Sequence, residues 1–118
     1  MRAAGDVFEQ RACAELERAG LKLLSRNYCT RYGELDLVML ERDTVVFVEV
    51  RHRCNAVYGD AAASVTASKQ AKLIKAAELW GIAYNKWAHF NCRFDVVAYD
   101  GPATNARMIW LRSAFETQ

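Results

Sequence analysis

The feature that most restricts the fold is a predicted β-hairpin at residues 33–53, GELDLVMLERDTVVFVEVRHR. Its two strands, 33–40 and 45–51, are apolar enough to be buried on both faces, which is typical of strands in a sheet covered on both sides. Arg42 and Asp43 form the expected two-residue turn. Such strands have no structural need of negative charge, yet they contain three acids: Glu34, Asp36 and Glu49.

The rest of the chain adds helices and strands to this hairpin. Residues 5–19 repeat apolar side chains at helical spacing, and Gly20 follows as a natural stop. Residues 54–65 begin as a polar, mobile loop. The other expected elements are one helix and three strands: 66–84, 21–28, 93–99 and 106–115. The order α-β-β-β-α-β-β predicts an α/β fold, a mixed sheet flanked by helices.

Length and composition predict one domain, residues 1–118, because 53% of the side chains are hydrophobic. No apolar run approaches the roughly 20 residues that span a bilayer. Acids interrupt the N-terminal segment from Asp6 onward, so it lacks a signal-peptide core. We therefore expect a cytoplasmic protein without a membrane partner. The four cysteines are scattered singly and are expected to be free, with Cys13 in the core.

Strand alternation predicts which side chains share a face. Glu34, Asp36 and Val38 should lie on one face of the first strand, and Leu35, Leu37 and Met39 on the other. The acids are therefore expected on the same side of the sheet rather than on opposite sides.

The turn also fixes which residues of the two strands face each other. A turn at residues 42–43 places Asp36 opposite Glu49, and Glu34 opposite Arg51. Like charges in facing positions destabilise a sheet, and burial raises the cost. A divalent cation would offset that cost, because hard cations prefer oxygen ligands. An internal ion-pair cluster, with Arg51 as a neutralising cation, is the alternative.

Five motifs occur in order along the chain: GDVFE at 5–9, RNY at 26–28, GELDLV at 33–38, VFVEVR at 46–51 and CRFDVV at 92–97. Together they resemble the YraN-like family of small bacterial proteins. That family is similar to the PD-(D/E)xK, restriction-endonuclease-like superfamily and to archaeal Holliday-junction resolvases. The resemblance spans residues 5–115. It implies a restriction-endonuclease-like sheet and a metal-dependent DNA endonuclease, with branched or otherwise structured DNA as a candidate substrate.

The resemblance also implies roles for single residues. Asp36 and Glu49 would hold Mg²⁺ or Mn²⁺, the Val50 carbonyl would be a further ligand, and Glu9 would reach in from the first helix. Glu34 would have a supporting place, or would pair with a cation. In such nucleases the ion assists hydrolysis of a phosphodiester bond.

One position departs from the superfamily pattern. The lysine expected two residues after the second acid is Arg51 here. Arginine keeps its proton in proteins, so Arg51 can orient a phosphate but cannot act as a base. Lysine at position 51 is expected to keep or raise cleavage. Lys69 on the second helix is a candidate substitute, with Gln70 beside it; the alternative is that Lys69 lies on a solvated face.

Charge supports a nucleic-acid partner. With Glu9, Glu34, Asp36 and Glu49 set apart, 16 basic side chains remain against 10 acidic ones, which suits a polyanion next to a metal ion. A homodimer would suit the cutting of two strands. The expected phosphate contacts are Arg31, Arg53, Lys72 and Lys75, with Tyr58 or Trp87 as stacking groups.

Two other classes of function compete with the endonuclease. The first is a module that keeps the nuclease fold, has little or no activity, and binds nucleic acid or a protein. The second is a thiol or zinc protein that uses His52 with Cys54, or His89 with Cys92, although zinc modules normally show tighter paired spacing.

Overall fold

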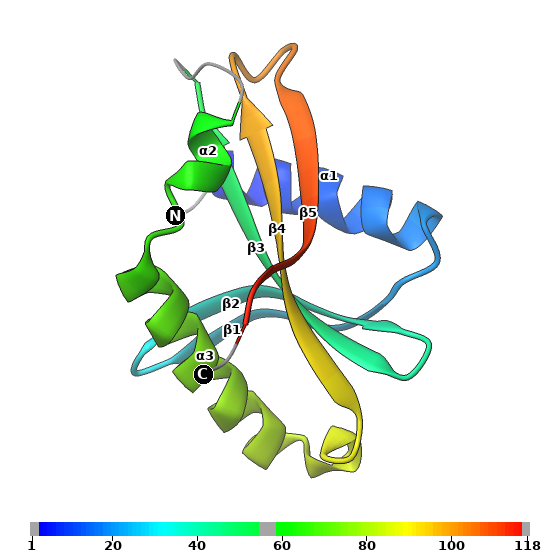
Figure 1. Ribbon diagram of the computed structural model, residues 1–118. Coiled ribbons are helices and arrows are strands. Elements are labelled where there is room, and N and C mark those ends of the chain that lie inside the picture. Colours follow the sequence, from blue (N-terminus) through cyan, green and yellow to red (C-terminus); the bar gives the residue numbers. More distant parts are fainter. Residues whose placement is uncertain (1–2, 55–58, 117–118) are drawn as a thin grey trace.

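The computed structural model describes residues 3–54 and 59–116, with the backbone alone described for residues 3–6. Helices and strands follow one another in nearly the expected order (Figure 1). Their bounds are α1 Ala3–Arg18, β1 Lys22–Thr30, β2 Gly33–Glu41, β3 Thr44–Arg53, α2 Asp60–Ala63, α3 Ala67–Ala83, the 3-10 helix η1 Asn85–Trp87, β4 Asn91–Asp100 and β5 Arg107–Phe115.

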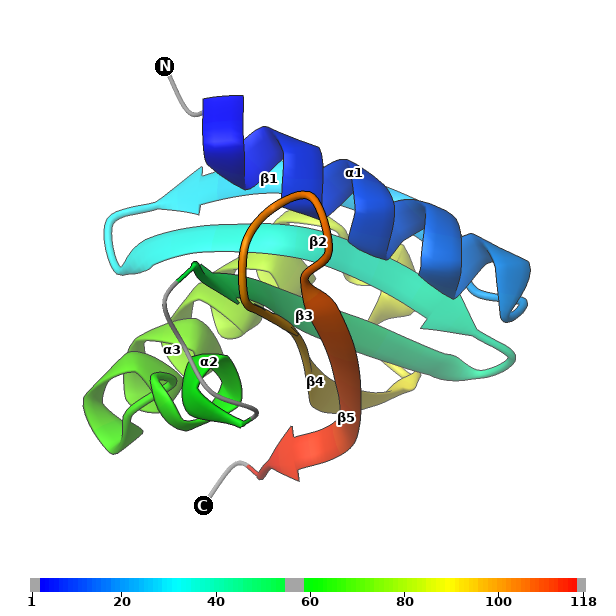
Figure 2. The same ribbon diagram turned by 90° about the horizontal axis from the view of Figure 1, so that it is seen from above.

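The strands form one five-stranded sheet in the order β1-β2-β3-β4-β5. All neighbours are antiparallel except β3 and β4, which are parallel and joined by a crossover that contains α2, α3 and η1. Helix α1 covers one face of the sheet and α3 covers the other (Figures 1 and 2). The predicted mixed sheet flanked by helices is therefore confirmed.

The expected loop at 54–65 was wrong in part, because residues 60–63 form the short helix α2. The Asp100 carboxylate accepts hydrogen bonds from the backbone N–H groups of Gly59 (2.8 Å) and Ala61 (2.9 Å), and Ala61 is fully buried. A distant acid at the end of β4 thus satisfies donors at the start of this helix, which local sequence does not reveal. The predicted mobility, and Tyr58, concern residues 55–58, which lie outside the described residues.

Each face of the sheet has its own hydrophobic core. The core under α1 is formed mainly by Phe8, Ala12, Cys13, Leu16, Leu21, Leu37, Met39, Val46, Val48, Val97 and Tyr99. The core under α3 is formed mainly by Leu35, Val38, Val45, Phe47, Ala61, Val65, Leu73, Ala76, Ala77, Trp80, Phe94, Val96 and Ala98. Strands β2 and β3 contribute to both cores, which explains their continuous apolar sequences.

The hairpin register is as predicted, but the ladder is shorter. Glu41 pairs with Thr44, and the pairing continues in step to its last pair, Leu37 with Val48. The expected facing pairs, Asp36 with Glu49 and Glu34 with Arg51, were therefore wrong. Beyond Val48, strand β3 remains paired with β4 while β2 remains paired with β1. Strands β2 and β3 therefore separate at Asp36 and Glu49.

The predicted alternation along β2 also breaks at this point. Leu35 packs in the core under α3 together with Val38, whereas Leu37 and Met39 pack under α1. The neighbouring strand β1 is distorted at the same level, because Asn27 has a left-handed backbone with φ 53°. Asn27 lies between Arg26 and Tyr28, which pair with Leu37 and Leu35 on either side of Asp36. The distortion of β1 lets the side chains of β2 switch from one face of the sheet to the other at this point.

Cys13 is buried, as expected, Cys29, Cys54 and Cys92 are exposed, and none of the four forms a disulfide. Within residues 3–54 and 59–116, no helix is both long and apolar enough to cross a membrane.

Candidate functional site

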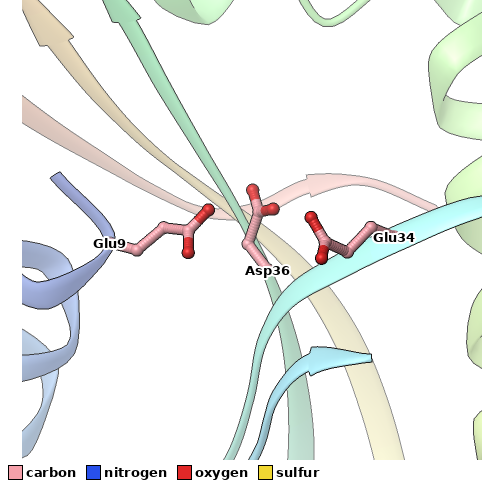
Figure 3. Close-up of side chains that lie close together, drawn as sticks. All are labelled: Glu9, Glu34 and Asp36. Atoms are coloured by element: carbon pink, nitrogen blue, oxygen red, sulfur yellow. The ribbon is translucent and has the colours of Figure 1, made fainter. Parts of the chain in front are cut away.

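Three carboxylates meet where β2 leaves β3. Glu9 comes from α1, and Glu34 and Asp36 come from β2; one oxygen of each lies within 4.8 Å of the others. Figure 3 shows Asp36 between the other two side chains. Glu9 and Asp36 are buried, at 4% and 8% exposed, and Glu34 is half-buried. Among the described residues this is the only group of three or more side chains with metal-ligating atoms so close together.

Glu49 of β3 completes the site and is 5% exposed. Its carboxyl lies within hydrogen-bonding reach of that of Asp36. Its Oε2 faces two cations, Arg51 Nη1 at 3.5 Å and Lys69 Nζ at 3.8 Å. Its Oε1 is buried and accepts no hydrogen bond. We call the four carboxylates of Glu9, Glu34, Asp36 and Glu49 the acidic pocket.

Burial and mutual repulsion change the acidity of the acidic pocket. Burial, followed by the charge of Glu49, raises the pKa of Asp36 to about 8, although the Val50 N–H donates to Asp36 Oδ2 at 2.9 Å and opposes the rise. Burial also raises the pKa of Glu49, against the opposing charges of Lys69 and Arg51. Asp36 therefore holds a proton at neutral pH unless a cation replaces it.

Glu9 is held by a residue to which sequence reasoning gave no role. Asn27 Nδ2 donates to Glu9 Oε1 at 2.7 Å. The left-handed backbone of Asn27 accompanies this contact, and asparagine is one of the few residues that adopt this conformation readily. The available signal was an asparagine in the middle of strand β1, inside the RNY motif.

Ser64 is a second residue that the sequence did not single out. It follows α2 directly and accepts two hydrogen bonds from Arg51, Nε to Oγ and Nη2 to the backbone oxygen, both at 3.1 Å. Nothing in the local sequence marks this serine, because its importance depends on the crossover connection that places α2 beside β3.

The remaining predicted site residues lie nearby. Lys69 reaches Glu49 from the first turn of α3, which begins after the N-cap Thr66. Gln70 Nε2 donates to the Val65 backbone oxygen at 3.2 Å. The backbone of Val50 contacts the acidic pocket through its N–H. The role of the Val50 carbonyl as a metal ligand remains a prediction.

Two of the predicted phosphate contacts lie together at the turn between β1 and β2. The Arg31 guanidinium carbon and Lys75 Nζ both lie over the Tyr32 ring, 5.0 and 5.2 Å from its centroid. Lys72 and Arg53 are also exposed, on α3 and at the end of β3. These positions are accessible to a ligand, while their binding role remains a prediction.

Trp87, the other expected stacking group, lies in η1 and packs edge-on against Phe90, with ring centroids 5.0 Å apart. The His52 ring stacks on Phe8 at 4.0 Å, and its Nε2 lies 2.8 Å from the Gly101 oxygen. In the described part of the chain, neither histidine belongs to a group of three metal-ligating side chains. The histidine–cysteine pairs therefore give no support to a zinc site.

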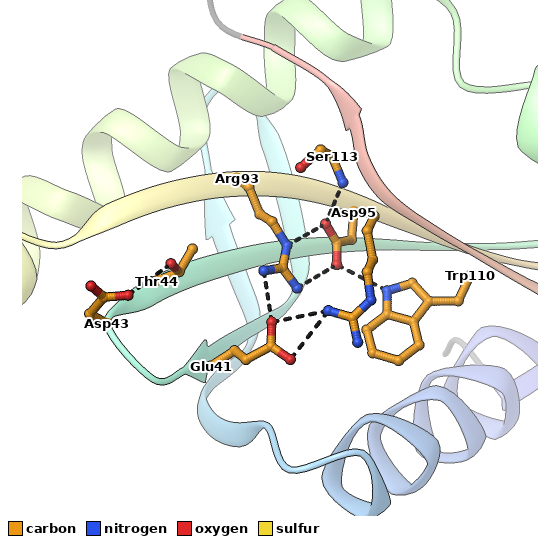
Figure 4. A network of polar contacts seen from close by, with 8 residues as sticks. Glu41, Asp43, Thr44, Arg93, Asp95, Trp110 and Ser113 are labelled. Atoms are coloured by element: carbon orange, nitrogen blue, oxygen red, sulfur yellow. Dashed lines mark hydrogen bonds and ion pairs between the residues drawn. The ribbon is translucent and has the colours of Figure 1, made fainter.

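A second polar cluster, which we call the Asp95 network, ties β5 to the sheet (Figure 4). Asp95 is fully buried and accepts hydrogen bonds from Arg93 Nε (3.0 Å), Trp110 Nε1 (2.9 Å) and the Ser113 N–H (2.9 Å). Arg93 also contacts Glu41 at 2.8 Å. The hydrogen bonds from Arg93, assisted by Arg112, lower the pKa of Glu41.

Comparison with known proteins gives one family. Residues 8–99 match the model described as "Uncharacterised protein family UPF0102". A UPF0102 protein of Stutzerimonas stutzeri is 51% identical over 114 residues, covering 97% of this chain and 95% of the relative. One of Pectobacterium carotovorum is 51% identical over 120 residues, covering 99% and 97%. One of Burkholderia pseudomallei is 51% identical over 119 residues, covering 97% of this chain and 76% of the relative.

Proposed function

The chain belongs to the UPF0102 family, and we propose that it is a metal-dependent endonuclease that hydrolyses phosphodiester bonds of DNA, branched DNA included. The observation that carries the proposal is the acidic pocket, in which the buried carboxyls of Asp36 and Glu49 lie against each other, and burial and the charge of Glu49 raise the pKa of Asp36. A fold stabilised only by its own contacts gains nothing from such repulsion.

The residues fit a hard divalent cation such as Mg²⁺ or Mn²⁺. Glu49 Oε1 is a buried oxygen without a hydrogen-bond partner, and the Asp36 carboxyl is mostly ionised only above about pH 8. Both features are corrected when a cation binds between carboxylates. Asp36 and Glu49 would hold the ion, with Glu9 and Glu34 close enough to take part. When bound, the ion supplies positive charge at the phosphate and makes a nearby water more acidic.

The chain's own cations would serve the DNA. Arg51 has a planar fork of N–H groups, which it would donate to a phosphate oxygen. Lys69 lies 3.8 Å from Glu49 and would bring a second positive charge to the phosphate. Asn27 would keep Glu9 directed at the acidic pocket through the 2.7 Å hydrogen bond.

The experiment is cleavage of labelled duplex, flap and four-way-junction DNA in Mg²⁺ or Mn²⁺. Glu49→Ala should abolish cleavage and leave DNA binding nearly unchanged, because binding rests on outlying basic residues. Glu78→Ala, which removes an exposed acid of α3, is the matched control and should cleave like wild type.

Failure of the wild type to cut any substrate would contradict the endonuclease. If the wild type then still bound one of the substrates with a steep salt dependence, the family fold would serve as a nucleic-acid-binding module. Equal cleavage by wild type and Glu49→Ala would also contradict the proposal, because it would indicate a contaminating nuclease.

A further inference from the structure

The Arg51 guanidinium is fixed on one side by Ser64. Its Nε donates to Ser64 Oγ and its Nη2 donates to the Ser64 backbone oxygen. The third nitrogen, Nη1, has no bond to Ser64 and lies 3.5 Å from Glu49 Oε2. Because arginine has five N–H groups and these contacts engage three, donors remain for an anion. The nitrogen nearest the acidic pocket is the least tightly bound.

Ser64 is itself held by a hydrogen bond that its hydroxyl donates, which leaves Oγ able to accept one from Arg51. Its hydroxyl donates to the Ala61 backbone oxygen at 2.6 Å, so the lone pairs of Oγ face Arg51. Helix α2 is fixed in turn by Asp100, which is 3% exposed and accepts from Gly59 and Ala61. A continuous chain of hydrogen bonds therefore connects the end of β4 to the Arg51 side chain.

We infer that Ser64 is a positioning residue that holds Arg51 as the receptor for a phosphate oxygen beside the acidic pocket, and that α2 exists in the crossover to place this serine. The identity of the anion, a DNA phosphate, rests on the proposed function. A lysine at position 51 has no planar fork with which to use both Ser64 oxygens. On this inference Arg51→Lys should lower cleavage, whereas the superfamily pattern predicts that it keeps or raises it.

The first arm of the test does not depend on activity. In ¹⁵N-labelled protein, the Arg51 Nε–H signal is identified by its loss in Arg51→Lys. Its exchange with water should be slow in wild type and in Ser64→Thr, which keeps a hydroxyl, and at least roughly tenfold faster in Ser64→Ala, because an N–H without its partner opens to solvent. Ser68→Ala, at an exposed serine of α3, is the control.

The second arm measures cleavage of the four-way junction with Mg²⁺. Ser64→Ala and Arg51→Lys should each lower kcat by roughly tenfold or more, the scale for losing a group that orients another. KM for DNA should change little, and Ser64→Thr should restore most of the rate. A circular-dichroism melt of each variant checks folding.

The outcomes separate the two proposals. If wild type cuts nothing, the proposed function fails, and the exchange of the Arg51 Nε–H still decides whether Ser64 positions Arg51. If wild type cuts and folded Ser64→Ala matches it in both kcat and exchange, the inference is wrong while the endonuclease stands. If Arg51→Ala binds Mg²⁺ more tightly and retains full cleavage, Arg51 is only a counter-ion of Glu49, and the inference is again overturned.

Discussion

The acidic pocket and the Asp95 network both bury carboxylates in the same sheet, but they treat the charge in opposite ways. Asp95 is fully buried, and two side chains and one backbone N–H donate to it. Glu49 is buried almost as deeply, yet its Oε1 has no hydrogen-bond partner, and the cation nearest to its Oε2 is 3.5 Å away. A buried carboxylate is thus fully hydrogen-bonded in one region and only partly compensated in the other.

The pKa values express this difference. Arg93 lowers the pKa of Glu41 in the Asp95 network, so the ionised form stabilises the fold. Burial and Glu49 raise the pKa of Asp36 in the acidic pocket, so the ionised form destabilises it. A carboxylate that the fold has already satisfied is structural, whereas one that the fold leaves strained is available to a ligand.

The largest expected effect is on the structural side. Asp95→Asn should lower the free energy of unfolding by about 3 kcal/mol or more, because the fully buried carboxylate accepts from Arg93, Trp110 and the Ser113 N–H, and asparagine replaces one accepting oxygen by an NH₂ donor that faces these donors. Urea denaturation at pH 7 measures this value. The control is Asp43→Asn, which changes an exposed acid at the β2–β3 turn and should stay close to wild type. Equal stability of Asp95→Asn and wild type would remove the contrast between the two regions.

The next effect concerns metal affinity. Affinity for Mg²⁺ should rise roughly tenfold per pH unit from about pH 6 to about pH 8, because the proton on Asp36 must leave before the carboxylate can bind a cation. Calorimetry in buffers of different ionisation enthalpy should detect release of that proton. Affinity that does not depend on pH would place the ion away from Asp36.

A smaller effect of opposite sign to that of Asp95→Asn is expected for Asp36→Asn in EDTA. The pKa of Asp36 is about 8 in the folded protein and near 4 when unfolded, so the stability present below about pH 4 is lost as pH rises from about 4 through about 8. Asparagine carries no charge, so the variant should be more stable than wild type by at least about 1 kcal/mol at pH 8.5 and nearly equal to it at pH 4. Thermal melts at both pH values measure this. Destabilisation at pH 8.5 would favour an internal ion-pair cluster.

The smallest effect tests the rim of the Asp95 network. The Arg112 side chain is 48% exposed, and Arg112→Ala should cost only about 0.5 kcal/mol through loss of its contact with Glu41. Arg93→Ala should cost several times more, because Arg93 contacts both Glu41 and buried Asp95. Since the pKa of Glu41 is lowered, its contribution should be lost as pH falls through that pKa. Equal costs for the two arginines would place the stabilisation at the surface.

Much of the fold followed from hydrophobic pattern and turn chemistry. The two-residue turn at 42–43 fixed the β2–β3 register correctly from Glu41–Thr44 to Leu37–Val48. Strand composition alone does not show where a ladder ends, because that depends on the pairing of β3 with β4 and of β2 with β1. The end of the β2–β3 ladder next to Asp36 could therefore not be predicted from the sequence.

Only part of the candidate site could be predicted from the sequence, because some of its contacts join distant segments of the chain. Acids in an apolar hairpin and a lysine near the start of a helix are conspicuous, and the structure places Asp36, Glu49 and Lys69 close together. Asn27 and Ser64 are ordinary polar residues in sequence. Their contacts join segments far apart in the chain, Asn27 with Glu9 and Ser64 with Arg51, so no local pattern identifies them.

The parallel pairing of β3 with β4 has a consequence for how the chain folds. The β2–β3 hairpin closes through a two-residue turn, an event on the scale of microseconds, whereas Thr44 meets Asn91 only after the whole crossover has formed. The hairpin therefore gathers Asp36 and Glu49 before Lys69 and Ser64 arrive with α3 and α2. The helices bury these acids only afterwards, so protonation or a bound cation should slow unfolding more than it speeds folding.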